Sequence, residues 1–146
     1  MLGRKTILIL GGTGEARAIA SALVARGHDV TSSLAGRTNA PLLPEGEVRI
    51  GGFGGVEGLA AYIQHHAVSL LIDATHPFAA QISANAVAAS ARANVPLIRF
   101  ERARWERPDG ASWVEVDNME EAASALPSGA KVLLTIGRQE VGAVYG

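Results

Sequence analysis

TILILGGTGEAR, residues 6–17, is the stretch that decides the fold of this chain. Its first five residues form a continuous apolar run, which is typical of a strand buried on both faces of a parallel sheet. Helical spacing of apolar residues then runs from Ala16 to Val24 and stops at Gly27. A second strand is predicted over 30–34. The stretch therefore opens a βαβ unit with a glycine-rich turn between strand and helix.

The same alternation of strands and helices continues along the chain. Further strands are predicted at 48–50, 69–72, 95–100, 113–116 and 131–136, and helices around Leu59–Ile63, at 78–93 and at 120–126. This order predicts an α/β protein with a Rossmann-like, doubly wound parallel sheet and helices on both faces.

Two details of the helix at 78–93 follow from its spacing. We expect Ile82, Ala86 and Ala89 to form the stripe that faces the sheet, and Asn94 to cap the helix. Right-handed crossovers bring the carboxyl ends of all parallel strands to one edge, which is where ligands of open α/β sheets bind. The unusual loops of the sequence are therefore expected at one edge.

Composition excludes several classes of site and function. The 146 residues carry a formal net charge of −1 and no cysteine, so disulfides, thiolate catalysis and cysteine-ligated zinc are excluded. No His/Asp/Glu group has metal-ligand spacing, and no metal is predicted. Balanced charge argues against a nucleic-acid surface or a basic membrane anchor. The apolar run at 7–10 is too short for a signal peptide, which favours a cytoplasmic protein.

The glycine-rich turn predicts a site for the diphosphate of a dinucleotide. Gly12 and Gly14 match the first two glycines of the G-x-G-x-x-G/A pattern, while Arg17 stands where a small residue is usual. Thr13 either caps the helix or donates its hydroxyl to phosphate. Glu15 lies in the first helical turn, where an acid interacts favourably with the helix dipole. The alternative is a tight structural turn.

The end of the second strand indicates which dinucleotide is bound. NAD enzymes usually carry an acid there for the ribose 2′-hydroxyl, but residues 31–37 contain none, and Asp29 precedes the strand. Ser33 and Arg37 instead suit a 2′-phosphate, because a guanidinium offers two parallel donors. The predicted cofactor is NADP(H). The alternative for Arg37 is a solvated loop cation.

Three further segments are candidate sites. Gly52, Phe53 and Gly54 form a glycine-rich loop that we expect over the nicotinamide or the diphosphate, although it could be a plain connection.

Thr75 and His76 follow a buried strand and are the candidate catalytic residues, with Pro77 expected at the first helical position. His76 would donate a proton or bind an acidic substrate, and its alternative role is to cap or pack. Asp73 is expected to accept backbone hydrogen bonds.

Arg99, Arg102 and Arg104 lie close together near Trp105 and could attract a carboxylate-rich substrate. The alternative is a solvated turn.

Five motifs in this order resemble the precorrin-6A reductases of cobalamin biosynthesis, and the resemblance extends over residues 7 to about 145. The motifs are ILILGGTGEAR, SLAGR, VRIGGFGG, IDATHPFA and RFERARW. The resemblance implies hydride transfer from NADPH to a macrocycle double bond, giving precorrin-6B, and a tetrapyrrole substrate with acetate and propionate groups. It also implies two Rossmann-like domains with the active site between them. Ala103 stands where the family often has proline.

The resemblance implies roles for individual residues. Gly12 to Glu15, Ser33 and Arg37 would lie near the cofactor, Gly52 to Gly54 and Thr75-His76 near the reacting centre, and the arginines would meet substrate carboxylates. Residues 1–128 would be the NADP-binding domain, and residues 129–146 the opening strand and helix of a second domain that is truncated.

Two other classes of function stay open. The chain could be a non-catalytic, nucleotide-binding regulatory Rossmann module. It could also be an S-adenosylmethionine methyltransferase, although that class usually has an acidic residue after the second strand and this sequence has none there. The sequence predicts no oligomeric state.

Overall fold

The computed structural model describes residues 3–36, 42–103 and 106–135, which fall into two compact units, Met1–Ala103 and Arg104–Gly146. The first unit alternates strands and helices in this order: β1 (Thr6–Leu10), α1 (Gly14–Ala25), β2 (Asp29–Leu34), β3 (Glu47–Ile50), α2 (Gly55–His65), β4 (Leu70–Asp73), α3 (Ala80–Ala93) and β5 (Leu97–Arg99).

The five strands form one parallel sheet in the order β3-β2-β1-β4-β5. The chain moves outward from β1 in one direction and then returns to build β4 and β5 on the other side. The carboxyl ends of β1 and β4 therefore flank the point where the strand order reverses, which is the usual ligand site of such sheets. The predicted doubly wound α/β fold is confirmed.

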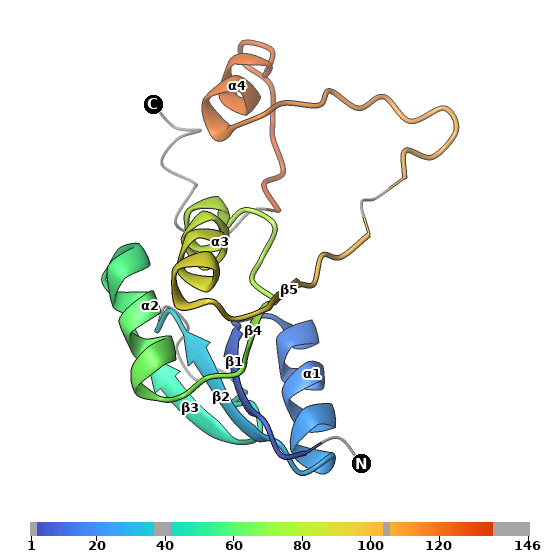
Figure 1. Ribbon diagram of the computed structural model, residues 1–146. Coiled ribbons are helices and arrows are strands. Elements are labelled where there is room, and N and C mark those ends of the chain that lie inside the picture. Colours follow the sequence, from blue (N-terminus) through green and yellow to red (C-terminus); the bar gives the residue numbers. More distant parts are fainter. Residues whose placement is uncertain (1–2, 37–41, 104–105, 136–146) are drawn as a thin grey trace. The chain divides into compact units, whose positions relative to one another are not determined.

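Helices cover both faces of the sheet. Figure 1 shows α1 on one side and α2 and α3 on the other. The alternation along β1 explains this division, because successive side chains of a strand point to opposite faces. Ile7 and Ile9 pack with Ala16 and Ala20 of α1, whereas Leu8 packs in the cluster of α2 and α3. Burying each such aliphatic side chain contributes about 1.5–3 kcal/mol.

The stripe of α3 that faces the core differs from the prediction. Ile82 is 40% exposed, and the buried residues are Ser83, Ala86, Ala89 and Ser90. Two of the predicted three positions are correct, and the isoleucine is wrong. The physical reason is that small side chains in the buried stripe let α3 approach the sheet and α2 closely, so the branched Ile82 lies outside that stripe. The hydroxyl of Ser90 is satisfied by the carbonyl of Val87 at 3.0 Å.

The start of α3 also differs. Pro77 is not the first helical residue but lies in a turn closed by the Ala79 amide, which donates to the His76 carbonyl at 2.9 Å. Proline suits the second position of such a turn because its φ is fixed. The helix begins at Ala80. Its predicted end is confirmed: Asn94 adopts the left-handed conformation with φ 54°.

The second unit contains one helix among its described residues, α4 (Met119–Ser124), close to the predicted 120–126. The Asn118 side chain caps it by accepting from the Glu121 amide at 2.9 Å. The strand predicted at 113–116 is not formed, and neither is one over 131–135, while residue 136 lies outside the described residues. A strand needs a hydrogen-bonding partner, and Val114 at 73% exposure has none of the burial that a core strand requires.

Candidate functional site

The glycine-rich loop after β1 is held at both ends by backbone hydrogen bonds. The Gly11 amide donates to the Ser33 carbonyl at 3.0 Å, which fastens the loop to the end of β2. Gly12 has φ +107°, a conformation that L side chains rarely adopt, and a Cβ there would project into open space. The loop then enters α1 at Gly14. Open space beside a positive-φ glycine just before a helix amino terminus fits the approach of a phosphate.

The Thr13 side chain has two partners within the protein. Its hydroxyl accepts from the Ala16 amide at 3.1 Å and donates to the Ala74 carbonyl at 2.8 Å. Of the two roles predicted for this side chain, the structure displays the helix cap. The bond to Ala74 also joins the loop after β1 to the loop after β4. The two loops at the point where strand order reverses are thereby held together.

Glu15 lies in the first turn of α1 and pairs with Arg102. The Arg102 Nε donates to the Glu15 Oε1 at 2.9 Å, and its Nη2 contacts the same oxygen. The pKa of Glu15 is lowered, first by a hydrogen bond from its own backbone amide and then by the hydrogen bond from Arg102. Arg102, predicted as a substrate contact, is thus occupied beside the predicted phosphate site.

The end of β2 lies next to this loop. Ser33 is buried, with its carbonyl bound to Gly11, and the neighbouring Ser32 is buried with no hydrogen-bond partner for its hydroxyl among the described residues. Asp29 lies at the opposite end of β2, where it pairs with Arg4 and is in register with Thr6. An acid is therefore absent from the carboxyl end of β2 over 31–36. Arg37 lies outside the described residues.

The glycine-rich loop after β3 is organised by Arg49, a residue that sequence reasoning missed. Its guanidinium donates to the carbonyls of Gly51 at 2.6 Å and Gly52 at 2.8 Å. The same group lies 3.9 Å from the centre of the Phe53 ring, which packs edge-on against Tyr62. Phe53 thus packs against the core, while Gly52, Gly54 and Gly55 are exposed. An arginine two residues before a glycine run was the available signal.

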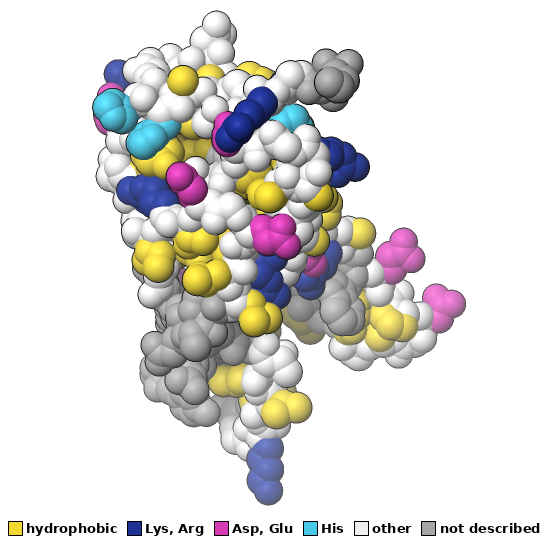
Figure 2. Space-filling view, turned by 90° about the horizontal axis from the view of Figure 1, so that it is seen from below, with side chains coloured by type: hydrophobic (Ala, Val, Ile, Leu, Met, Phe, Trp, Pro, Cys, Tyr) yellow, Lys and Arg dark blue, Asp and Glu magenta, His cyan; other side chains and the backbone are white. Residues whose placement is uncertain are grey.

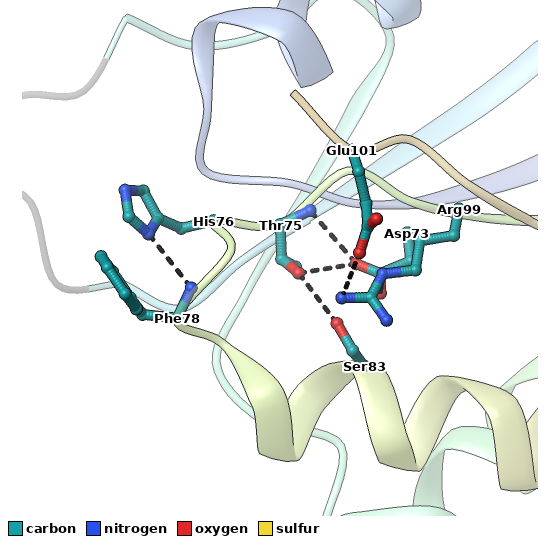
Figure 3. Close-up of polar contacts among 7 residues, drawn as sticks. All are labelled: Asp73, Thr75, His76, Phe78, Ser83, Arg99 and Glu101. Atoms are coloured by element: carbon teal, nitrogen blue, oxygen red, sulfur yellow. Dashed lines mark hydrogen bonds and ion pairs between the residues drawn. The ribbon is translucent and has the colours of Figure 1, made fainter. Parts of the chain in front are cut away.

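Asp73 ends β4 and organises the polar group drawn in Figure 3. It is 2% exposed, and its Oδ1 accepts from the Thr75 amide at 3.1 Å and from the Thr75 hydroxyl at 2.6 Å. The Ser83 hydroxyl lies 3.5 Å from that of Thr75. The expected structural role of Asp73 is confirmed, since it accepts a hydrogen bond from the Thr75 amide in the loop that follows β4.

The other carboxylate oxygen of Asp73 is left for Arg99. Its Oδ2 has no hydrogen-bond partner among the described residues and lies 4.0 Å from the Arg99 Nε. The Arg99 Nη2 pairs with Glu101 at 2.8 Å (Figure 3). Arg99 therefore lies between one buried and one exposed carboxylate. A guanidinium held in this way has donors directed by the protein before any ligand arrives.

His76 is exposed, and its ring lies beside that of Phe78. Its Nδ1 accepts a hydrogen bond from the Phe78 amide at 3.3 Å (Figure 3). In the neutral ring the proton then resides on Nε2, since an accepting nitrogen carries none. The exposed ring can therefore present Nε2–H as a donor.

Strand register places several of these side chains in one row across the carboxyl edge of the sheet. The row consists of Arg49, Ser33, Leu10, Asp73 and Arg99. Paired positions of neighbouring strands point to the same face, and Leu10 belongs to the cluster of α2 and α3. Two arginines therefore stand at the ends of a row with a serine and an aspartate between them. Arg104 lies outside the described residues.

Charge and apolar area are mixed on the surface. Figure 2 shows basic, acidic and hydrophobic side chains interspersed on the face that it draws, in keeping with the net charge of −1. In residues 3–36, 42–103 and 106–135, no three His, Asp or Glu side chains cluster as metal ligands would. Across the same ranges, none of the helices has both the length and the apolar character needed to cross a membrane.

Comparisons with known proteins agree on one family. The sequence model of the family described as precorrin-6x reductase CbiJ/CobK matches residues 6–145. A precorrin-6A reductase of Rhodococcus erythropolis is 52% identical over 139 residues, which are 94% of this chain and 56% of that protein. A second, of Rhodobacter capsulatus, is 50% identical over 136 residues, 92% of this chain and 54% of the relative.

A solved structure described as CobK precorrin-6A reductase superimposes with a TM-score of 0.91 at 48% identity, covering 96% of this chain and 56% of that one. The chain thus spans about half the length of the curated relatives it matches. Fold, motifs and identity converge, and the chain belongs to the CbiJ/CobK family of precorrin-6x reductases.

Proposed function

We propose that this chain forms the NADP-binding part of a reductase that passes hydride from NADPH to a macrocycle double bond of precorrin-6A, or a close tetrapyrrole relative, giving precorrin-6B. The observation that carries the proposal is the open, positive-φ turn at Gly12 between β1 and α1, in a chain about half identical to precorrin-6A reductases. The division into residues 1–128 and 129–146 is part of the same proposal.

The diphosphate of the cofactor would bind at Gly12, Thr13, Gly14 and Glu15. The amino terminus of α1 begins at this turn, and the positive end of the helix dipole favours an anion there. The open space at Gly12 supports this assignment, because the volume that a Cβ would fill is left for the ligand. Thr13 contributes through its backbone, since its hydroxyl is engaged by Ala74.

The 2′-phosphate of NADP would be recognised at the end of β2 by Ser33 and Arg37. The absence of an acid over 31–36, together with Asp29 at the far end of the strand, supports a phosphate rather than a free ribose hydroxyl. An acid at this place would repel the dianionic phosphate, whereas a guanidinium binds it through two donors.

The reacting centre would lie along the loops after β3 and β4. Gly52, Phe53 and Gly54 would border the cofactor, with Phe53 acting as the anchor that keeps this loop in place. Thr75 and His76 would face the substrate. NADPH supplies the hydride when bound, and the protein supplies orientation and a dry site. His76 can hold a proton at Nε2 at the edge of this region.

Substrate carboxylates would be met by Arg99 and Arg104. Arg99 supports this role because its partner Glu101 is 65% exposed, so a substrate acetate or propionate can replace it at the guanidinium. The buried Asp73 would keep the arginine at the sheet edge during that exchange.

The test is a comparison of NADPH and NADH binding to this chain by calorimetric titration. NADPH is expected to bind at least tenfold more tightly, and Arg37→Ala should remove most of that preference. Arg26→Ala is the matched control, because Arg26 donates to the carbonyl of Ala22 on α1 and should leave the preference unchanged. Equal affinity for the two cofactors contradicts the 2′-phosphate assignment.

Turnover distinguishes the reductase from a regulatory module. A protein that binds NADPH tightly and oxidises it only when precorrin-6A is added acts as the proposed reductase. Nucleotide binding without turnover would instead favour the regulatory module.

A further inference from the structure

Arg102 reaches a helix that precedes it by 87 residues in the sequence. It follows β5 by three residues, yet its Nε and Nη2 both contact the Glu15 Oε1 at the start of α1. Both residues belong to the Met1–Ala103 unit. The Glu15 carboxylate thus directs the Arg102 guanidinium to the amino terminus of α1, next to the glycine-rich loop after β1.

Glu15 brings a negative charge to the place proposed for the diphosphate. Its side chain is 30% exposed, and its carboxylate accepts a hydrogen bond from its own backbone amide at the helix amino terminus. The pKa of Glu15 is lowered by that bond and then by Arg102, so the group is an anion at neutral pH. A diphosphate would meet like-charge repulsion there unless the carboxylate is neutralised.

We propose that Arg102 neutralises the Glu15 carboxylate and so permits the diphosphate of the cofactor to bind at Gly12–Gly14. The inference rests on the proposed function and deepens it. It makes Arg102 a positioning residue for the nucleotide in place of a substrate contact.

Two other basic side chains near the glycine-rich loop, Arg17 and His76, differ from Arg102 in their contacts. The Arg17 Nη2 lies 3.8 Å from the position a Cβ on Gly14 would take, so this guanidinium lies beside the turn, but within the described part of the chain it forms no ion pair with Glu15. His76, when protonated, also favours the Glu15 anion. Arg102 differs from both because its Nε and Nη2 are already directed to the carboxylate.

A double-mutant cycle separates neutralisation from direct contact. Calorimetric titration with NADPH and with inorganic pyrophosphate would be done on the whole chain and on Arg102→Gln, Glu15→Gln and the double variant. Arg102→Gln should weaken both ligands about five- to tenfold, because the Glu15 charge would then repel the diphosphate. The double variant should return to within about threefold of the unmodified chain, because with Glu15 uncharged nothing remains to be neutralised.

Arg92→Gln is the matched control. Arg92 forms an exposed pair with Glu57 away from the loop, so its loss changes the same charge without touching Glu15. Its affinity for both ligands should be unchanged. Thermal unfolding of every variant confirms that the comparison is between folded proteins.

Four results would contradict the inference, the proposed function or both. If Arg102→Gln weakens ligand binding equally in the unmodified chain and in Glu15→Gln, the arginine touches the ligand itself, and the inference is overturned. The inference is also overturned if Arg102→Gln does not weaken binding. A chain that binds pyrophosphate but not NADPH refutes the proposed function and leaves the neutralising role intact if the cycle shows coupling. A chain that binds neither ligand overturns both.

Discussion

The hydroxyl of Thr13 donates a hydrogen bond to the carbonyl of Ala74 over 2.8 Å, joining two loops that lie 61 residues apart in the sequence. One loop follows β1 and the other follows β4, and the strand order of the sheet reverses between these two strands. The same oxygen caps α1 by accepting from the Ala16 amide. One side chain therefore sets both the start of the helix and the spacing of the loops at the candidate site.

Replacing Thr13 by valine should lower the free energy of unfolding by about 1–3 kcal/mol. The change removes the helix cap and leaves the Ala74 carbonyl without its donor, while keeping the shape of the side chain. Urea unfolding measures the loss. Thr13→Ser retains the hydroxyl and should stay within about 0.5 kcal/mol of the unmodified chain. Equal losses in the two variants would argue against the hydroxyl.

Gly58 in α2 is required by a close approach of backbone. A Cβ on Gly58 would lie 1.6 Å from the Phe53 carbonyl oxygen, so the loop after β3 would have to move. Gly58→Ala should therefore destabilise the protein by about 2–3 kcal/mol, measured by urea unfolding. Gly14→Ala is the control, since the nearest atom there is the end of the Arg17 side chain at 3.8 Å. A Gly58→Ala protein as stable as the control would rule out this packing.

Arg49 should determine how often the loop over 51–55 opens. Arg49→Met keeps an apolar stem but loses the donors to the Gly51 and Gly52 carbonyls and the cation over Phe53. Amide hydrogen exchange at Gly51, whose amide donates to the Leu34 carbonyl at 2.9 Å, is expected to quicken about tenfold, which corresponds to about 1.4 kcal/mol. Arg92→Met provides the comparison with an arginine outside this loop. Unchanged exchange at Gly51 would show that the loop is held by other contacts.

The free energy of unfolding should fall at low pH because two carboxyl groups have lowered pKa values in the folded protein. The pKa of Glu15 is lowered by its own backbone amide and by Arg102, and that of Asp29 by the hydrogen bond from Arg4. A lowered folded-state pKa stabilises the protein above the unfolded-state values, about 4.3 for Glu and 3.9 for Asp, and the contribution is lost as pH falls through the folded-state values.

Urea unfolding between about pH 2.5 and 7 measures this dependence, and Glu15→Gln and Asp29→Asn should each flatten it. Arg4→Gln should flatten it as well, because it removes the partner that lowers the pKa of Asp29. A pH dependence that is as steep in all three variants as in the unmodified chain would assign acid sensitivity to other groups.

The errors of the sequence analysis have local causes. Ile82 was expected in the core because helical periodicity does not distinguish a stripe from its neighbour one residue on, and the close packing of α3 selects small residues. The strand at 113–116 was predicted from β-branched and aromatic residues alone, although a strand also needs a partner. Pro77 suits a turn as well as a helix start, and only the Ala79 hydrogen bond distinguishes them.

The order of strands and helices in the first unit, the glycine-rich loop after β1 and the lack of an acid at the end of β2 were all determined by the sequence alone. Each depends on apolar periodicity, on glycine or on the identity of a few adjacent residues, and such properties act over one turn or one strand. The pairing of Glu15 with Arg102, the row that ends in Arg99 and the bond from Thr13 to Ala74 were decided only by tertiary structure. These contacts depend on which strands become neighbours, because polar groups far apart in the chain interact only after the sheet has brought them within hydrogen-bonding distance.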